Sequence, residues 1–431
     1  MEKSEIEKKY GSINRTYSNN ELESVKKCRI TAGNKDEFFV QARKKLMLTM
    51  SQAEEDINHF FNCIKLSYSG FDTFLSDEIC NKLEKNLCQK LHKRLRKTIS
   101  NELLCEYLYK ELAPFIQESH FMLICGRLTR VFSKPYIAYV AEIILQETEK
   151  GFLVIKGNRN FKENYIFNKK DVEEYLLPTL YPEGMKNPED KFFLLGIYSL
   201  EKKDTIKIDG KKIKLHRILS DFAEQKNCPR LLDYEKYAVV NHTTYQLEKN
   251  QEVLESFKTE GKYCSTKENV ILNLLGNHGG TDFFPDNFFD GFIGTHYSEL
   301  TVARLQNPLE LDNSVVKYEV YSLQQDKTEN DYKGQFYVLM NKSTASSGED
   351  AVAVAKNIPG TIFAGSASSG CGTFGDCIHY QLPNSKIIFY FGYKYFAHNS
   401  FEEGKGYLPD FWIDSIFPLE VVENHIKRMM I

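Results

Sequence analysis

A run of small hydroxyl residues lies between an apolar segment and an alanine-rich segment near residue 346. The sequence FYVLMNKSTASSGEDAVAVAKN over 336–357 predicts a buried strand, a short turn and a helix. A serine hydroxyl is a weak nucleophile, so a site that uses one must supply a base for its proton and donors for the oxyanion. A helix N-terminus offers free N–H groups and the positive end of the helix dipole. The segment suits an activated serine, and a simple helix cap by Thr344, Ser346 or Ser347 is the alternative.

A second segment places a glycine-rich turn after another buried strand. It reads ENVILNLLGNHGGTDFF over 268–284, and the turn occupies residues 276–280. Glycines at such a turn let bare backbone N–H groups approach a ligand or a reacting carbonyl. Many α/β proteins turn on glycine at this place, so the segment gains meaning only beside the serine segment.

Together the two segments resemble the C-terminal processing (tail-specific) serine peptidase family, whose nucleophile lies in a Thr-Ala-Ser-x-x-Glu-like motif after such a turn. Here the motif is TASSGE over 344–349. The resemblance implies that the nucleophile is Ser346, that peptide bonds are hydrolysed through an acyl-enzyme, and that the substrate is a peptide or unfolded protein. The expected oxyanion donors are the backbone N–H of Ser347 and that of Gly279 or Gly280.

The base of the family's lysine-dyad branch is missing. In that branch a lysine lies in a Gly-Lys-Gly context on the strand-to-loop segment that follows. The matching stretch here, AGSASSGCG over 364–372, has Cys371 between Gly370 and Gly372. A thiol cannot do the work of a neutral lysine, so the sequence predicts that the Ser-Lys dyad is absent.

The chain also resembles the tricorn-like branch of the superfamily, which uses a Ser-His pair from the N-terminal helical region and a glutamate near the C-terminus. The segment YKELAPFIQESHFMLIC is predicted as a helix that ends at a turn carrying Ser119 and His120. EEGKGYLPD matches a Glu-x-x-Gly-x-x-Pro-Asp signature with the glutamate at Glu403, and the adjacent Glu402 is its rival. The resemblance implies that His120 takes the proton of Ser346, that the glutamate orients the imidazole, and that Ser119 assists.

The other histidines rank below His120 as bases. His242 ends a strand that enters the last domain and is the second choice. His278 lies in the glycine turn, where it either touches substrate or is exposed. His216 and His379 lie in strand-like contexts and are interpreted as structural.

Composition and motifs exclude several other classes of function. A formal net charge of −3 argues against nucleic acid as a partner, and the basic run KLHKRLRK over 90–97 is interpreted as the solvated face of a helix. The ten cysteines show no zinc-ligand spacing, so no metal is expected and the thiols are expected to be free. The glycines of 365–375 lack the Gly-Lys-Ser/Thr ending of a phosphate-binding loop. No cofactor is expected.

No signal or membrane segment is recognisable in the chain. The N-terminus has no apolar h-region, and no stretch approaches the about 18–20 apolar residues that span a bilayer. We expect a cytoplasmic protein without a membrane partner, with an exported form that has lost its signal as the alternative. The sequence leaves oligomerisation open.

Four regions are predicted, in a multidomain α/β fold. Residues 1–44 read as a polar, loosely held arm, and 45–125 as an α-helical domain that carries the candidate histidine and opens with a capping box of Ser51 and Glu54. Residues 126–235 are β-rich. Residues 236–431 alternate strands and helices, and by resemblance form a layered peptidase domain of the ClpP/crotonase-like type.

The β-rich region contains two predicted hairpins and one surface loop. One hairpin joins YIAYVAEIIL to GFLVIKG, and the other turns at Asp209-Gly210. The segment YPEGMKNPED over 181–190 is the predicted loop. Many family members carry a PDZ domain in this interval, but its glycine-rich carboxylate-binding loop is not recognisable, so tail recognition is not expected.

Two other functions fit the same residues. One is a catalytically silent peptide-binding protein on the same fold, because the dyad lysine is absent. The other is an esterase or crotonase-like acyl enzyme, because a strand followed by a glycine turn also suits enolate stabilisation. A covalent adduct at Ser346 would distinguish a peptidase or esterase from both the lyase and the silent protein.

Overall fold

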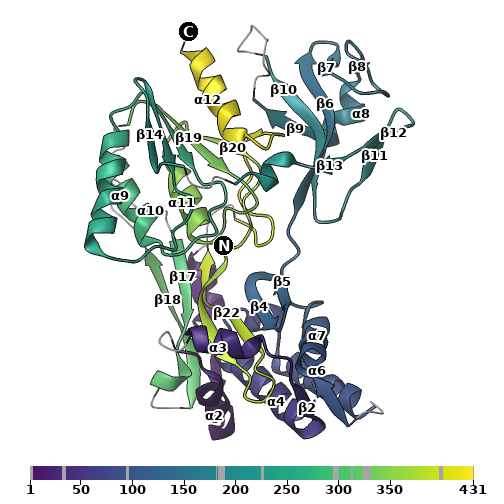
Figure 1. Ribbon diagram of the computed structural model, residues 1–431, viewed down its shortest axis with the longest axis vertical. Helices are drawn as coiled ribbons and strands as arrows, with labels where there is room; N and C mark the ends of the chain where they lie inside the picture. Colours follow the sequence, from purple (N-terminus) through teal and green to yellow (C-terminus); the bar gives the residue numbers. More distant parts are fainter. Residues whose placement is uncertain are drawn as a thin grey trace. The chain divides into compact units, whose positions relative to one another are not determined.

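The computed structural model describes most of the chain, as drawn in Figure 1. The described residues are 3–31, 35–93, 97–180, 182, 190–224, 228–294, 300–311, 314–323, 332–397 and 401–430. The fold is a mixed α/β fold. It divides into a first unit of residues 1–134, 299–324 and 371–404 and a second unit of residues 135–298, 325–370 and 405–431. This division differs from the predicted boundaries, because parts of the 236–431 region pair with N-terminal strands.

Helices build much of the first unit. Their bounds are α1 (Lys3–Tyr10), α2 (Asn19–Cys28), α3 (Lys35–Ala42), α4 (Met50–Ser67), α5 (Phe71–Phe74), α6 (Asp77–His92) and α7 (Asn101–Leu112). The prediction of a loosely held arm over 1–44 is wrong. Ile6, Tyr10, Val25 and Cys28 are buried in the core of the first unit, at helical spacings of four and three residues. Two apolar residues per helix are too few for the sequence pattern to stand out.

The start of α4 differs from the predicted capping box. Thr49 caps the helix: its hydroxyl accepts from the N–H of Gln52 at 3.3 Å, and the Gln52 side chain accepts from the N–H of Thr49 at 2.9 Å. The prediction of Ser51 and Glu54 is therefore wrong by two residues. Glutamine serves at the third helical position as well as glutamate does.

An antiparallel sheet completes the first unit. Its strand order is β1 (Asn14–Thr16), β18 (Val315–Leu323), β17 (Leu300–Leu305), β22 (Ile388–Ala397), β4 (Glu118–Cys125) and β5 (Leu128–Phe132), and β21 (Phe374–Gln381) also pairs with β22. A two-stranded ladder joins β2 (Met47–Thr49) to β3 (Thr98–Ser100). Because α7 ends at Leu112, Ser119 and His120 lie on β4 and not on the predicted helix-end turn.

The second unit contains the predicted β-rich region. Its sheet has the order β8 (Ile166–Phe167), β7 (Gly151–Lys156), β6 (Ile137–Thr148), β10 (Phe192–Ser199) and β9 (Leu176–Thr179), and β13 (His216–Arg217) also pairs with β6. Both predicted hairpins are confirmed: β6 pairs with β7, and β11 (Thr205–Ile208) pairs with β12 (Lys211–Lys214). Most of the predicted 181–190 loop lies outside the described residues.

The rest of the second unit is the predicted layered α/β domain. Its sheet runs β14 (Leu231–Asp233), β15 (Tyr237–Asn241), β16 (Asn269–Asn273), β19 (Gln335–Met340), β20 (Ile362–Gly365) and β23 (Phe411–Trp412), parallel from β15 onward. The helices are α9 (Gln251–Cys264), α10 (Phe283–Ile293), α11 (Ser347–Ala355) and α12 (Pro418–Met429), with α9 and α10 side by side (Figure 1). Because β16 and β19 are parallel neighbours, the turns that follow them leave the same edge of the sheet.

Candidate active site

Ser346 lies in the turn between β19 and α11 in a strained backbone conformation. Its φ is 53° and its ψ is −125°, values that residues other than glycine seldom adopt. The Ser346 side chain makes no capping hydrogen bond to the helix. The surrounding backbone holds the strain, because the Ser346 carbonyl accepts from the N–H groups of Glu349 at 2.6 Å and Asp350 at 3.1 Å. The helix-cap alternative is therefore wrong for Ser346, and its hydroxyl is presented without a structural hydrogen bond to the helix.

The glycine turn packs directly against this serine. Gly279 has a φ of 85°, and a Cβ added there would lie 2.8 Å from the Cβ of Ser346 and 3.1 Å from the nitrogen of Ser347. Gly280 has a φ of 146°, and a Cβ there would lie 2.0 Å from the carbonyl oxygen of Tyr245. Neither position tolerates a side chain. The turn can approach Ser346 this closely only because both residues are glycine.

The candidate oxyanion donors differ in availability. The N–H of Gly279 donates to the side-chain oxygen of Asn277 at 2.8 Å, so it is already engaged. Within the described residues, the N–H groups of Ser347 and Gly280 have no hydrogen-bond acceptor in the protein. The structure thus leaves Ser347 and Gly280 as the candidate donors, and gives Gly279 the role of close approach.

Asn277, which the sequence analysis did not single out, joins the two turns. Its carbonyl accepts from the N–H of Ala345 at 2.9 Å, and its side-chain amide donates to the carbonyl of His242 at 2.8 Å. The backbone carbonyl of Asn277 holds the serine turn while its side chain holds Gly279, so this buried residue fixes the two turns against each other. An Asn within a glycine-rich turn was the only sequence signal.

Both ring nitrogens of His242 are occupied by structural partners. Nε2 lies 2.8 Å from Glu260 Oε2, and Nδ1 lies 3.0 Å from the hydroxyl of Tyr245. Arg230 completes the cluster with a 3.0 Å ion pair to Glu260. Burial lowers the pKa of His242 below its ordinary value, and Glu260 partly offsets that shift. The contacts give this second-choice base a structural role.

The motif glutamate, Glu349, anchors the loop that follows β20. Its Oε1 accepts from the hydroxyl of Ser368 at 2.5 Å and from the N–H of Gly370 at 2.7 Å. The Ser368 hydroxyl in turn accepts from the N–H of Tyr407 at 2.7 Å. The nucleophile helix therefore holds the loop directly before Cys371 in place.

Three aspartates of α11 and α10 form a second group that the sequence analysis missed. Burial, then the charge and hydrogen bond of Asp282, raise the pKa of Asp350 well above its ordinary value. Burial and the charge of Asp282 raise the pKa of Asp286 to about 8. A carboxyl with a pKa of about 8 is mostly protonated at neutral pH, so Asp286 adds little negative charge to this group.

In the first unit, the imidazole of His120 contacts the thiol of Cys371. The sulfur lies 3.3 Å from Nδ1 and 3.4 Å from Nε2. Burial lowers the pKa of His120 to about 4, a shift that a hydrogen bond with the Phe374 backbone and the charge of Asp376 oppose. At neutral pH the ring is therefore uncharged and able to accept a proton.

Glu403 binds the backbone on both sides of this pair. Its Oε1 accepts from the N–H of Ser119 and its Oε2 from the N–H of Thr373, each at 3.0 Å. Within the described residues, neither ring nitrogen of His120 is hydrogen-bonded to Glu403, in contrast to the expected contact with the imidazole. Glu402 is exposed, so the backbone contacts favour Glu403 over its rival.

Two further side chains, those of Ser119 and Glu118, lie close to Glu403. The hydroxyl of Ser119 is hydrogen-bonded to that of Ser133 at 2.9 Å. Glu118 is fully buried and accepts from the N–H of Gly392 at 3.3 Å. Burial raises its pKa to about 8, a shift that a bond with Tyr68 opposes and the charge of Glu403 reinforces. Glu118 therefore adds no second negative charge beside Glu403 at neutral pH.

The remaining histidines have other surroundings. His278 is exposed in the glycine turn. His216 lies 3.0 Å from Asp414 Oδ2, and His379 stacks on Tyr390 with ring centroids 4.7 Å apart. The structure thus groups the predicted site residues in two sets: Ser346, Ser347, Gly279 and Gly280 in the second unit, and His120, Ser119 and Glu403 in the first.

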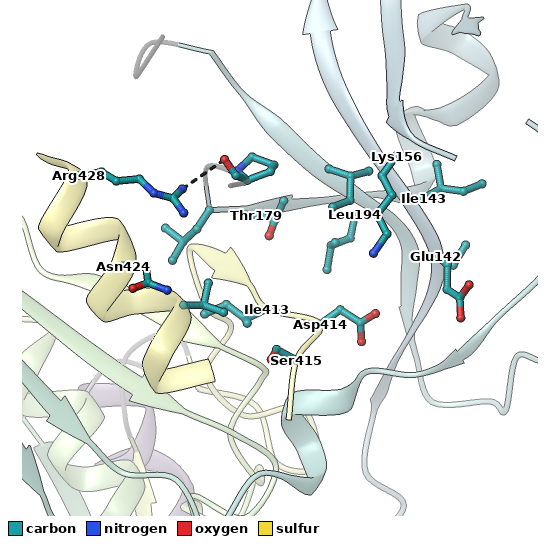
Figure 2. A pocket seen from close by; sticks show the side chains of 15 residues that line it. Glu142, Ile143, Lys156, Thr179, Leu194, Ile413, Asp414, Ser415, Asn424 and Arg428 are labelled. Carbon is teal, nitrogen blue, oxygen red and sulfur yellow. Dashed lines mark hydrogen bonds between the residues drawn. The ribbon is translucent and has the colours of Figure 1, made fainter. Parts of the chain in front are cut away.

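A cavity of about 270 Å³ lies elsewhere in the second unit, between the β-rich sheet and α12 (Figure 2). Its wall is largely apolar and includes Ile143, Leu194 and Ile413, while Lys156 and Arg428 supply positive charge. Asp414 lines it as well but is held by His216. None of the predicted catalytic residues lines this cavity.

Two other kinds of site are absent from the described parts of the chain. No group of three or more His, Cys, Asp or Glu side chains there could hold a metal ion. No helix among the same residues is long and apolar enough to cross a membrane.

Comparison with known proteins assigns the segment that contains the serine and glycine turns. Residues 236–413 match the model of Peptidase family S41. S41 peptidases are serine peptidases, so this segment places the chain in that class of enzyme. No curated protein is significantly similar to the chain.

Several solved structures align with this chain over most of its length, at low sequence identity. A putative peptidase from Parabacteroides merdae is 13% identical, with 89% of this chain and 96% of that chain covered and a TM-score of 0.45. Mature CPAF is 11% identical, with 88% and 96% covered and a TM-score of 0.48. The photosystem II D1 C-terminal processing protease is 13% identical, with 84% and 93% covered and a TM-score of 0.38. At these scores they add nothing about the residues of the site.

Proposed function

We propose that this chain hydrolyses peptide bonds through an acyl-enzyme on Ser346. The observation that carries the proposal is the strained backbone of Ser346, with a φ of 53° and no helix-capping bond, packed against Gly279. Strain of this kind persists where the surrounding structure enforces it and is concentrated at functional sites. The free N–H groups of Ser347 and Gly280 support the same assignment, since an acyl transfer needs donors for its oxyanion.

His120 is the proposed general base, as in the tricorn-like branch. It takes the proton of Ser346 as the hydroxyl oxygen attacks the peptide carbonyl, then returns that proton to the leaving amine. Water then enters and gives a proton to His120 as its oxygen attacks the acyl carbon. His120 returns that proton to the Ser346 oxygen as the acyl group leaves as a carboxylic acid. With a pKa lowered to about 4, the ring of His120 is uncharged at neutral pH and has a free lone pair when the cycle begins.

Glu403 is proposed as a positioning residue for His120. Its two oxygens bind the N–H groups of Ser119 and Thr373, so it would fix the strand that carries His120 through the backbone. Ser119 contributes its backbone N–H, which donates to Glu403. Its hydroxyl is hydrogen-bonded to Ser133 and is not assigned a step.

A lysine base is the alternative, and the lysine near the nucleophile is Lys342. Its Nζ donates to the carbonyl of Ser368 at 2.7 Å, to the hydroxyl of Tyr198 at 3.3 Å and to the carbonyl of Lys405 at 3.4 Å. Carbonyl acceptors stabilise the ammonium form, which has no lone pair to accept a proton. These contacts favour His120 over Lys342.

A fluorophosphonate probe followed by mass spectrometry tests the proposal. We expect wild type to be labelled on Ser346, Ser346→Ala to be unlabelled, and Ser347→Ala to keep its labelling because only its backbone N–H is used. His120→Ala should lose labelling by about 10²-fold or more, since a general base contributes that much. His278→Ala is the matched histidine control.

Three results would overturn this assignment. Folded wild type that neither reacts with the probe nor cleaves an unfolded fluorescent protein would point to a silent peptide-binding protein. Labelling that survives in His120→Ala and disappears in Lys342→Ala would transfer the base to the lysine. Probe labelling with ester turnover but no peptide cleavage would indicate an esterase.

A further inference from the structure

The thiol of Cys371 and the imidazole of His120 form a pair that the proposed peptidase mechanism does not use. The sulfur is almost equidistant from the two ring nitrogens, at 3.3 and 3.4 Å. It therefore lies against the part of the ring between the nitrogens rather than in line with one of them. Both distances lie within hydrogen-bonding range for sulfur, so the ring can accept the proton of the thiol.

The protein holds both partners of the pair by their backbones. Glu403 binds the N–H groups of Ser119 and Thr373, which are one residue before His120 and two residues after Cys371. The contact therefore joins two anchored segments, and a thiol held beside an uncharged imidazole differs from an isolated buried cysteine.

Cys371 is a buried residue with a small exposed fraction, so we expect only small reagents to reach its sulfur. Cys371 is 7% exposed, and its neighbours Gly370 and Gly372 have no side chains to cover it. The ring of Phe401 packs on Gly372, where an added Cβ would lie 3.0 Å from it. Reagents the size of peroxide or iodoacetamide suit this opening better than bulky maleimides.

We propose that Cys371 is a modification site for small thiol-directed electrophiles and peroxides, with His120 as the base that activates it. With iodoacetamide, the Sγ proton passes to His120, a carbon–sulfur bond forms, the carbon–iodine bond breaks and iodide leaves. With a peroxide, a sulfur–oxygen bond forms as the oxygen–oxygen bond breaks, so sulfur is oxidised by two electrons and the leaving oxygen takes the proton. Either adduct lies against the ring that the proposed peptidase needs free.

Other cysteines of the chain serve as internal controls. Cys88 and Cys228 are both more exposed than Cys371, and within the described residues neither is hydrogen-bonded to an imidazole. Burial raises the pKa of Cys88 above its ordinary value, which disfavours its reactive thiolate. If exposure alone governs reactivity, these two residues react first. If the imidazole governs it, Cys371 does.

The test is limited labelling of the folded, full-length chain with iodoacetamide at pH 7, with the modified fraction of each cysteine measured by mass spectrometry. We expect Cys371 to react about tenfold faster than Cys88 or Cys228, because the adjacent imidazole can accept the proton of the thiol as the carbon–sulfur bond forms. In His120→Gln, Cys371 should become the slowest of the three while the other two keep their rates. Preferential labelling of Cys88 or Cys228 in wild type, or labelling of Cys371 that is unchanged in His120→Gln, overturns the inference.

A second measurement connects the adduct to catalysis and rests on the proposed function. Peroxide or iodoacetamide should abolish fluorophosphonate labelling in wild type and in the control Cys88→Ser, but not in Cys371→Ser. If Cys371→Ser does not fold, the labelling comparison in His120→Gln still decides the inference. Fast labelling of Cys371 in a chain that never reacts with the fluorophosphonate would contradict the peptidase proposal and still support the thiol site. If Ser346 still reacts with the fluorophosphonate after Cys371 is fully modified, the adduct has no effect on catalysis. That result would contradict our inference that it blocks the ring of His120.

Discussion

The two units contribute their candidate site residues in different ways. In the second unit the candidate nucleophile is defined by the backbone: the positive φ of Ser346, the glycine turn that packs against it, and the N–H groups of Ser347 and Gly280. In the first unit the candidate base is defined by side chains: His120 against Cys371, with Glu403 binding the flanking backbone. Adding a side chain to the glycine turn should therefore abolish most of the activity in one step. Substitutions around His120 should lower the activity by smaller, graded amounts.

The largest expected effect is that of Gly279→Ala. The new Cβ would lie 2.8 Å from the Cβ of Ser346 at a φ of 85°, so the turn must move away from the nucleophile. This movement would displace the N–H of Gly280, a candidate oxyanion donor in the same turn. Losing such a donor costs about 10²–10³-fold in rate, and we expect fluorophosphonate labelling to fall by that much.

Gly276→Ala is the matched control for this substitution. Gly276 also has a positive φ, 77°, but an added Cβ would meet nothing within 4 Å. It should lower the free energy of unfolding by about 1–2 kcal/mol through backbone strain and leave labelling nearly intact. Equal loss of labelling in the two variants would mean that strain, and not the approach to Ser346, is what matters.

The same contrast explains what the sequence could predict. The layered sheet, both hairpins and the strand–turn–helix at Ser346 follow from local patterns of apolar residues and glycine, which the residues themselves carry. The surroundings of His120 do not, because β4 acquires its neighbours by pairing with β22, more than two hundred residues away in the chain. The predicted helix-end turn at His120 was wrong for that reason, and the contact with Cys371 could not be foreseen.

A smaller effect, on stability, is expected from Asp286→Asn. The pKa of Asp286 is about 8 in the folded chain and near 4 when unfolded, so its contribution to stability is complete below about pH 4 and is lost as pH rises toward 8. Asparagine keeps the shape without the titration. The variant should equal wild type in the free energy of unfolding near pH 4 and be the more stable protein at pH 8, with a difference that grows by about 1.4 kcal/mol for each pH unit between those values.

The sign of that difference is the critical outcome. An Asp286→Asn variant that is less stable than wild type at pH 8 would show that the carboxyl is ionised and stabilising there. Asp290→Asn, on the same helix and paired with Lys258, is the control and should show no such gain at high pH.

The smallest expected effect distinguishes the two roles considered for Glu403. If it positions His120 through the N–H groups of Ser119 and Thr373, Glu403→Gln keeps a neutral acceptor in place and should lower the rate about tenfold, the low end of what a lost orienting partner costs. The acid limb of the pH–rate profile, set by the His120 pKa of about 4, should then remain where it is in wild type: activity present above that pH and lost as pH falls through it. A carboxylate acting directly on the imidazole would raise the pKa of the ring, so its removal would move the limb to lower pH. Glu402→Gln, the exposed neighbour, should change neither quantity, and a limb that shifts in Glu403→Gln alone would restore the direct contact.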